Sequence, residues 1–292
     1  MNIVITGAGG QLGQDCLNIL GIVHRVQGYT SRQLDITNTQ QVLKEISRVQ
    51  PDTLINCAAY TAVDNCEKDQ ERCRAVNELG AANLAAASAA IGCRLIHVST
   101  DYVFDGNKPV PEPYTEQDPV SPLSAYGRTK LAGEQAVARH LDKYLILRTA
   151  WLYGIGGNNF LKTMLRLATS DPKRTIRVVD DQHGSLTWSM TLARQIERLL
   201  SSDLSGVVHA TAENSSTWFG GAQYFLETMG VDFSLEPCTT ADYPTPAHRP
   251  TNSILENSRL KKHGLHVMQD WQQDIHDFVD RYREDLLEEA SA

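Results

Sequence analysis

Hydrophobic and polar positions in the first half of the chain alternate between two periods. Short apolar or β-branched runs typical of buried strands lie at residues 2–6, 23–29, 53–55, 94–99 and 144–148. Apolar positions at helical spacing lie between them, at residues 11–20, 38–49, 71–90 and 124–140. Asn38 is suited to cap the second of these helices. Strands that alternate with helices predict an α/β fold, a Rossmann-type, doubly wound parallel sheet covered on both faces over residues 1–150.

The pattern loosens after residue 151. Helical spacing continues at residues 160–168, 191–200, 217–229 and 271–289, and strand-like runs lie at 175–179 and 207–210. Residues 236–250 contain four of the eleven prolines, which predicts an ordered loop. We therefore expect residues 151–292 to form mainly a smaller substrate-binding lobe, with strands from about 175–210 returning to the main sheet.

The composition indicates a globular enzyme rather than a nucleic-acid-binding or membrane protein. The 292 residues are 41% apolar and 21% charged, and a formal net charge of -8 without a long basic run argues against a nucleic-acid partner. No apolar run reaches the roughly 20 residues that span a bilayer. The six cysteines show neither a Cys-x-x-Cys pair nor zinc spacing. Free thiols fit a reducing compartment, so we expect a cytoplasmic protein without a structural metal.

A glycine-rich turn follows the first predicted strand and opens the first predicted helix. Small residues in this context let the backbone approach a pyrophosphate whose charge sits at the helix N-terminus. The residues concerned are Gly7, Gly10, Gln11, Leu12 and Gly13. The turn predicts a dinucleotide site, and the alternative is a purely structural turn.

The end of the second predicted strand indicates which dinucleotide binds. An acidic residue there would accept the ribose hydroxyls of NAD, whereas an arginine accommodates the 2′-phosphate of NADP. The chain has Ser31 and Arg32 at this place, with no carboxylate before Asp35. This favours NADPH, with NADH as the alternative if Arg32 is an ordinary solvated side chain. Asp35 and Ile36 come where such folds usually touch the adenine.

Tyr126 and Lys130 lie four residues apart, so they share one face of a predicted helix. A neighbouring ammonium favours the phenolate and lowers the pKa of a tyrosine from its usual ~10. Thr100 ends the fourth predicted strand, and its hydroxyl completes an acid–base unit for a sugar or alcohol oxygen. Because ligands bind at the carboxyl edge of open α/β sheets, these residues predict the site of an oxidoreductase. The alternative is a surface tyrosine and a solvated lysine.

The third predicted strand ends at the same edge of the sheet, with small residues beside the expected pyrophosphate: Cys57, Ala58, Ala59 and Tyr60. This run, the glycine turn and the Tyr-x-x-x-Lys spacing together resemble the extended short-chain dehydrogenases/reductases. Longer stretches are similar to the dTDP-4-dehydrorhamnose reductase family within that group. They lie at residues 55–64, 99–106, 126–134, 148–153, 158–160 and 248–253.

The resemblance implies reduction of the C4 keto group of dTDP-4-dehydrorhamnose to dTDP-L-rhamnose, with hydride from NADPH. It implies that Tyr126 protonates the developing alkoxide, that Thr100 hydrogen-bonds the reacting oxygen, and that Lys130 holds the nicotinamide ribose and tunes Tyr126. The implied contacts to the sugar nucleotide come from Asp101, Tyr102, Phe104, Trp151, Asn159, Gln182 and Arg249.

Two positions depart from the usual family pattern. Leu186 stands where related sequences usually have proline, which affects the path of the loop around His183. Some members dimerise around Mg²⁺ held by glutamates, but this chain has Asp15 and Met190 near those places. We therefore predict no metal site, and we expect a monomer or a homodimer.

Two alternative functions share these motifs. A nucleotide-sugar epimerase or dehydratase would use the same Tyr126 and Lys130, although dehydratases typically have an Asp-Glu pair where this chain has Asp101 followed by Tyr102. The other alternative is a regulatory protein that binds NADP without catalysis, like the β subunit of methionine adenosyltransferase. Turnover of NADPH with a keto-sugar nucleotide distinguishes an enzyme from such a subunit.

Overall fold

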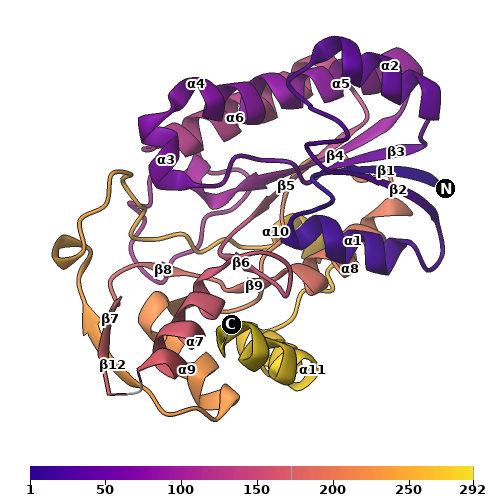
Figure 1. Ribbon diagram of the computed structural model, residues 1–292. Helices are drawn as coiled ribbons and strands as arrows, with labels where there is room; N and C mark the ends of the chain where they lie inside the picture. The colour runs from indigo at the N-terminus through magenta and orange to yellow at the C-terminus, as the bar shows by residue number, and fades with distance from the viewer. Residues whose placement is uncertain (172, 292) are drawn as a thin grey trace.

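The centre of the protein is a six-stranded parallel sheet with the strand order β10-β5-β4-β3-β1-β2. The structure is a computed structural model that describes residues 1–171 and 173–291 (Figure 1). The strands of the sheet are β1 (Asn2–Thr6), β2 (Arg25–Tyr29), β3 (Thr53–Asn56), β4 (Arg94–Thr100), β5 (Tyr144–Thr149) and β10 (Gly206–His209). The strand order reverses beside β1, which is where open α/β folds bind ligands.

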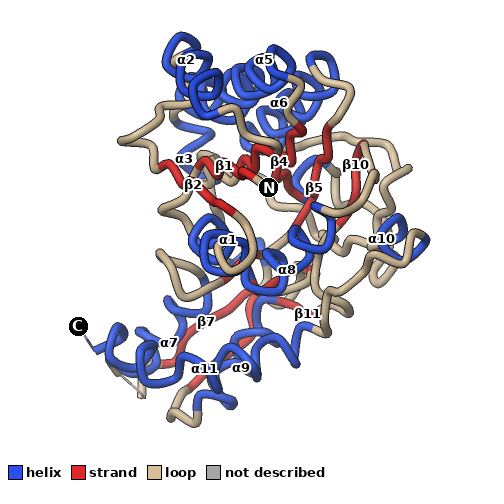
Figure 2. The backbone as a smooth tube through the Cα atoms, turned by 90° about the vertical axis from the view of Figure 1, so that its right-hand side faces the viewer, coloured by secondary structure: helices blue, strands red, loops and turns tan. Residues whose placement is uncertain are grey.

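Alternating side chains of the strands face two different helix layers. Ile3 and Ile5 pack with α1 (Gln11–Leu20) and α8 (Ser189–Leu200), whereas Val4 packs with the opposite layer. That opposite layer contains α2 (Thr39–Val49), α5 (Ala81–Ile91) and α6 (Ala125–His140), which lie together above the sheet in Figures 1 and 2. The sheet is thus covered on both faces, as the near-continuous apolar strands predicted.

Helix boundaries in this half follow local signals. The Asn38 side chain accepts a hydrogen bond from the backbone of Gln41 at the start of α2, as predicted. The helix predicted over residues 71–90 is instead interrupted, because a π-helical turn (Ala75–Gly80) joins α4 (Gln70–Arg74) to α5. Within this turn the Asn77 side chain bonds both the N–H and the C=O of Tyr60. The π-helical turn therefore holds the segment that follows β3 through Asn77.

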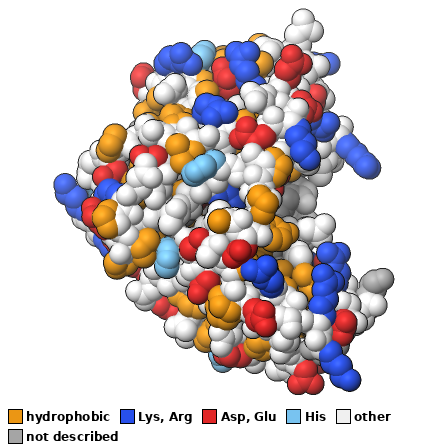
Figure 3. All heavy atoms as spheres, turned by 90° about the vertical axis from the view of Figure 1, so that its left-hand side faces the viewer, with side chains coloured by type: hydrophobic (Ala, Val, Ile, Leu, Met, Phe, Trp, Pro, Cys, Tyr) orange, Lys and Arg blue, Asp and Glu red, His pale blue; other side chains and the backbone are white. Residues whose placement is uncertain are grey.

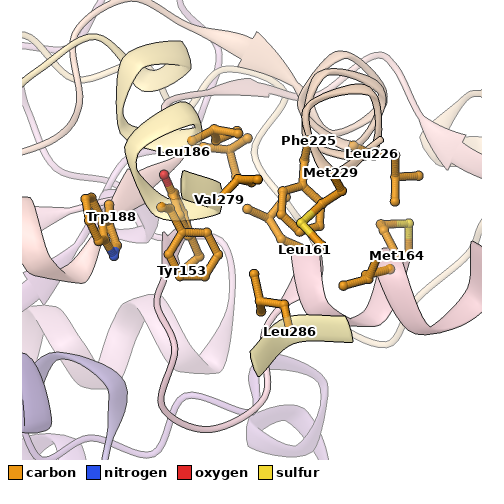
Figure 4. Close-up of a cluster of buried hydrophobic side chains, with 14 of the residues drawn as sticks. Tyr153, Leu161, Met164, Leu186, Trp188, Phe225, Leu226, Met229, Val279 and Leu286 are labelled. Atoms are coloured by element: carbon orange, nitrogen blue, oxygen red, sulfur yellow. The ribbon is translucent and has the colours of Figure 1, made fainter. Parts of the chain in front are cut away.

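In the described part of the chain, the second lobe is built from three two-stranded ladders and three long helices. The ladders pair β6 (Leu152–Tyr153) with β9 (Thr187–Trp188), β8 (His183–Gly184) with β11 (Ser216–Thr217), and β7 (Thr175–Val179) with β12 (Ser234–Cys238). The helices are α7 (Phe160–Ser170), α9 (Trp218–Met229) and α11 (Trp271–Ser291). Their buried faces meet in one apolar core, part of which Figure 4 draws. Short elements complete the chain: α3 (Val63–Lys68), α10 (Ser258–Lys262) and 3₁₀ turns at Asp101–Val103 and Thr240–Asp242.

Two predictions for this half need correction. Of the two strands expected to return to the main sheet, β10 does so beside β5, but β7 pairs with β12 instead. The apolar residues of β7, Ile176 and Val178, pack in the core of the second lobe, which keeps the strand there. β12 also extends into the stretch predicted as loop, because its backbone gains a parallel partner that no local pattern reveals. Leu186, the residue that replaces proline, is buried in the same core.

The surface carries charges of both signs. On the face drawn in Figure 3, Lys and Arg side chains are interspersed with Asp and Glu side chains. Among the described helices, none combines the length and the apolar character that crossing a membrane requires.

Candidate active site

A cleft of about 720 Å³ runs between the carboxyl edge of the main sheet and the second lobe. Its sheet-side wall comes from the turn after β1, the ends of β3 and β4, and the start of α6. Its lobe-side wall comes from segments around β6, α7 and the start of α9. The predicted site residues that line it are Gly10, Gln11, Leu12, Gly13, Cys57, Ala59, Thr100, Asp101, Tyr102, Tyr126, Lys130, Trp151, Asn159 and Arg249.

The glycine turn is shaped by close backbone contacts. Gly7 has a φ of 71°, and a Cβ atom there would lie 2.5 Å from the backbone nitrogen of Ala58. A Cβ on Gly13 would lie 2.2 Å from the carbonyl oxygen of Gly7. Gly10 is the N-cap of α1, so the free N–H groups of the first helical turn face the cleft at this point. This cradle fits the pyrophosphate of a dinucleotide.

The end of β2 lies directly beside the glycine turn. The Ala8 nitrogen donates to the Tyr29 carbonyl at 3.0 Å, and Gly9 lies against the Thr30 side chain. Ser31 and Arg32 follow and are exposed to solvent, which leaves Arg32 accessible to a phosphate. The structure therefore places the predicted NADP-selecting residues next to the predicted pyrophosphate cradle.

The residues expected near the adenine have different surroundings. Asp35 is exposed, and its carboxylate accepts bonds from the N–H and the hydroxyl of Thr37 at 2.9 and 2.8 Å. Ile36 is buried in the core beneath α2 and α5, against Gly80. Ala58 and Tyr60 flank the cleft-lining Ala59, and their backbones are held by Asn56 and Asn77, respectively.

Tyr126 and Lys130 lie in the first two turns of α6, and both side chains are buried. Ser124 caps this helix by accepting a bond from the Gly127 nitrogen at 3.1 Å, which fixes where α6 begins. The Lys130 ammonium donates to the Val98 carbonyl at 2.6 Å, so the lysine is tied to β4. The Tyr126 ring meets the Tyr102 ring edge-on, with centroids 5.4 Å apart. The first turns of α6 are therefore held against the end of β4.

The ionisation of this pair differs from the prediction. Burial raises the pKa of Tyr126 well above its ordinary value, and the hydroxyl of Thr100 opposes this only in part. Burial therefore decides the net direction, and the pKa of Tyr126 is raised although Lys130 stands one helical turn away. Burial also lowers the pKa of Lys130 to about 8, against the influence of Glu134. Tyr126 thus keeps its proton at neutral pH, as a proton donor must.

Thr100 ends β4 within the same cleft. Its hydroxyl donates to the Asp101 carboxylate at 2.9 Å and accepts a bond from the Tyr102 nitrogen at 3.2 Å. Asp101 is buried, and burial raises the pKa of its carboxyl to about 6. To bond a substrate oxygen, the Thr100 hydroxyl has to turn away from Asp101.

The lobe-side wall is dominated by two stacked indoles. Trp151 and Trp218 lie face to face with centroids 3.7 Å apart and planes 11° from parallel. Trp151 has a φ of 47°, an uncommon backbone conformation for a bulky residue. Gln182 lies behind the cleft, where its carbonyl accepts a bond from the Trp218 indole at 3.1 Å and its amide donates to Thr240 at 3.0 Å. Gln182, predicted to contact the sugar nucleotide, instead holds the indole that does line the cleft.

Asn159 connects the two lobes. Its amide nitrogen donates to Gln11 of the glycine turn at 2.9 Å, and its carbonyl caps α7 by accepting from the Lys162 nitrogen at 3.1 Å. The predicted sugar-nucleotide residue therefore also ties the start of α7 to the start of α1.

Arg249 reaches the cleft from the proline-rich loop, but it is already paired. Its two terminal nitrogens donate to the Asp64 carboxylate at 3.2 and 2.7 Å, and one also donates to the Thr245 hydroxyl. This ion pair holds the pKa of Asp64 below its usual range, mainly through the hydrogen bond from Arg249. An anion that binds Arg249 thus has to share it with Asp64 or displace it.

Phe104 is not in the cleft, which corrects its predicted role. It is 2% exposed and stacks on Tyr114 with centroids 4.4 Å apart, and His209 packs edge-on against it. The 3₁₀ turn at Asp101–Val103 directs Tyr102 toward the cleft and Phe104 into this separate aromatic cluster.

Three residues of the site were given no role from the sequence: Trp218, Asp64 and Glu134. Trp218 stands directly after the helix-capping Thr217, and no spacing relates it to Trp151. Asp64 and Glu134 occur in the family-like stretches, but their partners, Arg249 and Arg148, lie far away in the chain. A sequence signal marked the position of each acid and gave no sign of its partner.

Comparison with known proteins identifies the family. The family model described as the RmlD substrate binding domain matches residues 1–284. The chain is 40% identical over 281 residues to the dTDP-4-dehydrorhamnose reductase of Mycolicibacterium smegmatis, across 95% of this chain and 84% of that protein. This chain belongs to the dTDP-4-dehydrorhamnose reductase family.

Other members resemble the chain over a similar length. The dTDP-4-keto-6-deoxy-D-glucose reductase of Streptomyces niveus is 40% identical over 271 residues, which cover 92% of this chain and 93% of that protein. The crystal structure of dTDP-4-dehydrorhamnose reductase from Bacillus anthracis str. Ames, in complex with NADP, has a TM-score of 0.93 at 37% identity. The match covers 96% of this chain and 99% of the Bacillus anthracis chain. The family resemblance and the Rossmann-type fold predicted from the sequence are confirmed.

Proposed function

We propose that this protein reduces the C4 keto group of dTDP-4-dehydrorhamnose to give dTDP-L-rhamnose, with NADPH as the reductant. The observation that carries the proposal is the convergence of Thr100, Tyr126 and Lys130 on a cleft whose other end is a glycine cradle. The names of the relatives support the substrate, and the NADP complex of the Bacillus anthracis relative supports the cofactor.

The chain's residues divide the chemistry among them. When bound, NADPH would supply the hydride that reduces the keto carbon. Gly7, Gly10 and Gly13, with the intervening Gln11 and Leu12, would hold its pyrophosphate, and Arg32 would pair with its 2′-phosphate. Tyr126 would donate its proton to the oxygen as negative charge develops there, with Thr100 as a second hydrogen-bond donor. Lys130 would bind the nicotinamide ribose and stabilise the negative charge left on Tyr126.

The lobe-side wall would orient the sugar nucleotide. Trp151 would cover the hexose, because an aromatic ring packs well against the C–H groups of a sugar. Arg249 would bind the diphosphate through its planar guanidinium. On this basis we propose that residues 1–150 mainly bind the cofactor and residues 151–292 mainly bind the substrate.

Localisation and assembly are part of the proposal. We propose a cytoplasmic enzyme, monomeric or homodimeric, without a nucleic-acid partner. Free cysteines support the reducing compartment, and light scattering after gel filtration measures the oligomeric state.

An NADPH oxidation assay with a panel of 4-keto sugar nucleotides tests the function. The panel should contain dTDP-4-dehydrorhamnose, its 4-keto-6-deoxy-D-glucose epimer, and UDP-linked forms of both. We expect the highest kcat/KM for dTDP-4-dehydrorhamnose. Faster turnover of the glucose epimer would assign the activity named for the Streptomyces niveus relative. NADPH binding without turnover of any panel member would favour the regulatory-subunit alternative.

A further inference from the structure

A buried ionic cluster lies directly behind the Tyr126–Lys130 pair. Glu134 and Arg148 form a two-pronged ion pair, with nitrogen–oxygen distances of 2.9 and 2.7 Å, and their side chains are 5% and 6% exposed. The Ser99 hydroxyl donates to the same carboxylate at 2.5 Å. Arg148 stands on β5 and Ser99 on β4, so the cluster joins α6 to two neighbouring strands of the sheet.

Burying this pair is costly, so stability alone is a weak reason for its presence. Removing two charges from water has a desolvation penalty that an ion pair often only balances, and apolar residues of similar volume are frequently as stable. The position of the pair suggests another role. Glu134 lies four residues after Lys130, one turn further along the same face of α6.

Apart from Glu134, few interactions of Lys130 favour its protonated form. It is 2% exposed, and its ammonium is bonded to the neutral carbonyl of Val98. The titratable groups that face it are Tyr126 and Glu134 of α6, His97 of β4, Cys57 after β3 and Cys73 of α4. Burial lowers the pKa of His97 well below its usual value, so this imidazole is neutral. Among these groups, Glu134 is the one carboxylate, and it is ion-paired with Arg148.

We propose that Glu134 is a positioning residue whose carboxylate, held in place by Arg148 and Ser99, keeps Lys130 in its protonated form. In the proposed function, a protonated Lys130 binds the cofactor's ribose and stabilises negative charge on Tyr126. The effect of Glu134 on catalysis therefore rests on that proposed function. The ionic cluster itself touches neither ligand and acts through the lysine.

Titration of Lys130 in the ligand-free protein tests the proposal without any activity. Lysine side-chain NMR between pH 6 and 10, with the Lys130 signal assigned by Lys130→Met, gives the ionisation midpoint directly. In Glu134→Gln we expect this midpoint to fall by roughly one to two pH units, the effect of one unit charge about 6 Å away inside a protein. A midpoint equal to that of the wild type overturns the proposal.

Two further variants separate electrostatics from folding. Glu134→Gln leaves Arg148 without its ionic partner, so Glu134→Gln/Arg148→Met provides a cluster with no unpaired charge. It should still shift the midpoint downward, but by less than Glu134→Gln, because the repulsion from Arg148 is removed as well, and no downward shift in the double variant would overturn the proposal. Glu78→Gln is the matched control, because it removes a carboxylate of an exposed i,i+4 pair with Arg74 on the neighbouring π-helical turn. We expect no shift of the Lys130 midpoint in this control, and a shift as large as that of Glu134→Gln would overturn the assignment to Glu134.

The pH dependence of the reaction tests the effect of Glu134 on catalysis. The alkaline limb of kcat/KM for NADPH reports ionisations of the free enzyme, so Glu134→Gln should move it to lower pH by the same amount. If the wild type turns over no keto-sugar nucleotide, the proposed function fails while the NMR titration still decides the role of Glu134. If the wild type is active and neither the limb nor the midpoint moves, the inference fails and the function stands.

Discussion

The two walls of the cleft are built in different ways. The sheet-side wall consists of the turn after β1, the ends of β3 and β4, and the start of α6, so its residues lie at strand ends of the main sheet or on a helix packed against β4. The lobe-side wall depends on contacts between distant segments. Gln182 holds Trp218 across 36 positions of sequence, and Asp64 holds Arg249 across 185.

This difference predicts that the two walls affect different kinetic parameters. The end of β4 and the start of α6, which packs against β4, place Thr100 and Tyr126 together, which suits groups that we propose act on the reacting atoms. Side-chain hydrogen bonds such as Gln182–Trp218 and Asp64–Arg249 hold residues that we propose contact the rest of the substrate. Changes in the sheet-side wall should therefore act mainly on kcat or on the cofactor, and changes in the lobe-side wall mainly on KM for the sugar nucleotide.

The largest effect is expected from Tyr126→Phe. The change removes the proton donor and keeps the ring that packs on Tyr102. We expect kcat to fall by ~10²–10⁴, the usual contribution of general acid catalysis. NADPH affinity, measured by fluorescence titration, should be nearly unchanged because the glycine turn is untouched. A variant that retains near-full turnover would exclude Tyr126 as the acid.

Arg249→Ala should have the next largest effect, on KM for the sugar nucleotide. We expect an increase of well over tenfold, with a smaller change for NADPH, because a guanidinium bound to the diphosphate is lost. Arg249→Lys should recover only part of this, since an ammonium keeps the charge without the two-pronged geometry.

Asp64→Asn is the control for Arg249. If Arg249 contacts the diphosphate, Asp64→Asn should raise KM much less than Arg249→Ala does, because the guanidinium remains. Equal increases would mean that the Asp64–Arg249 pair merely anchors the proline-rich loop and that the diphosphate binds elsewhere.

Arg32→Ala should weaken NADPH binding more moderately. A hydrogen bond to a charged group contributes ~1.5–3 kcal/mol, but Arg32 is exposed, so we expect a loss at or below the lower end of that range, about tenfold in Kd. NADH binding should barely change, since NADH lacks the 2′-phosphate. Calorimetric titration with both cofactors measures this, and equal losses would assign Arg32 a structural role.

The smallest effect is expected from Gln182→Met. This side chain of similar length cannot donate to Thr240 and is a poor acceptor for Trp218, so the Trp218 indole loses its anchor. We expect KM for the sugar nucleotide to rise by roughly threefold to tenfold, the equivalent of one hydrogen bond, with kcat for the bound substrate preserved. A loss confined to kcat would place Gln182 at the reacting atoms and contradict the division between the two walls.

Local sequence patterns were most successful where one short segment decides its own conformation. The cap at Asn38 and the start of α6 at Ala125 follow from side chains that bond their own helix. Predictions were less successful where the partner is distant in sequence. The π-helical turn depends on Asn77 bonding Tyr60, and β12 forms because β7 lies beside it. Phe104 was expected in the cleft from the family resemblance, but the 3₁₀ turn at Asp101–Val103 directs it into a separate buried cluster.

The sequence by itself determined the glycine turn after β1 and the placing of Tyr126 and Lys130 on one helix face. Glycine spacing, a four-residue Tyr–Lys interval and alternating strands and helices act through backbone geometry, which a few neighbouring residues fix. Only the tertiary structure decided the ionisation and the partners of the site. Burial raises the pKa of Tyr126 and lowers that of Lys130 to about 8 because the surrounding chain excludes water from both. The pairs Trp151–Trp218, Asp64–Arg249 and Glu134–Arg148 likewise exist because the fold brings distant segments within contact distance, a property that no local pattern encodes.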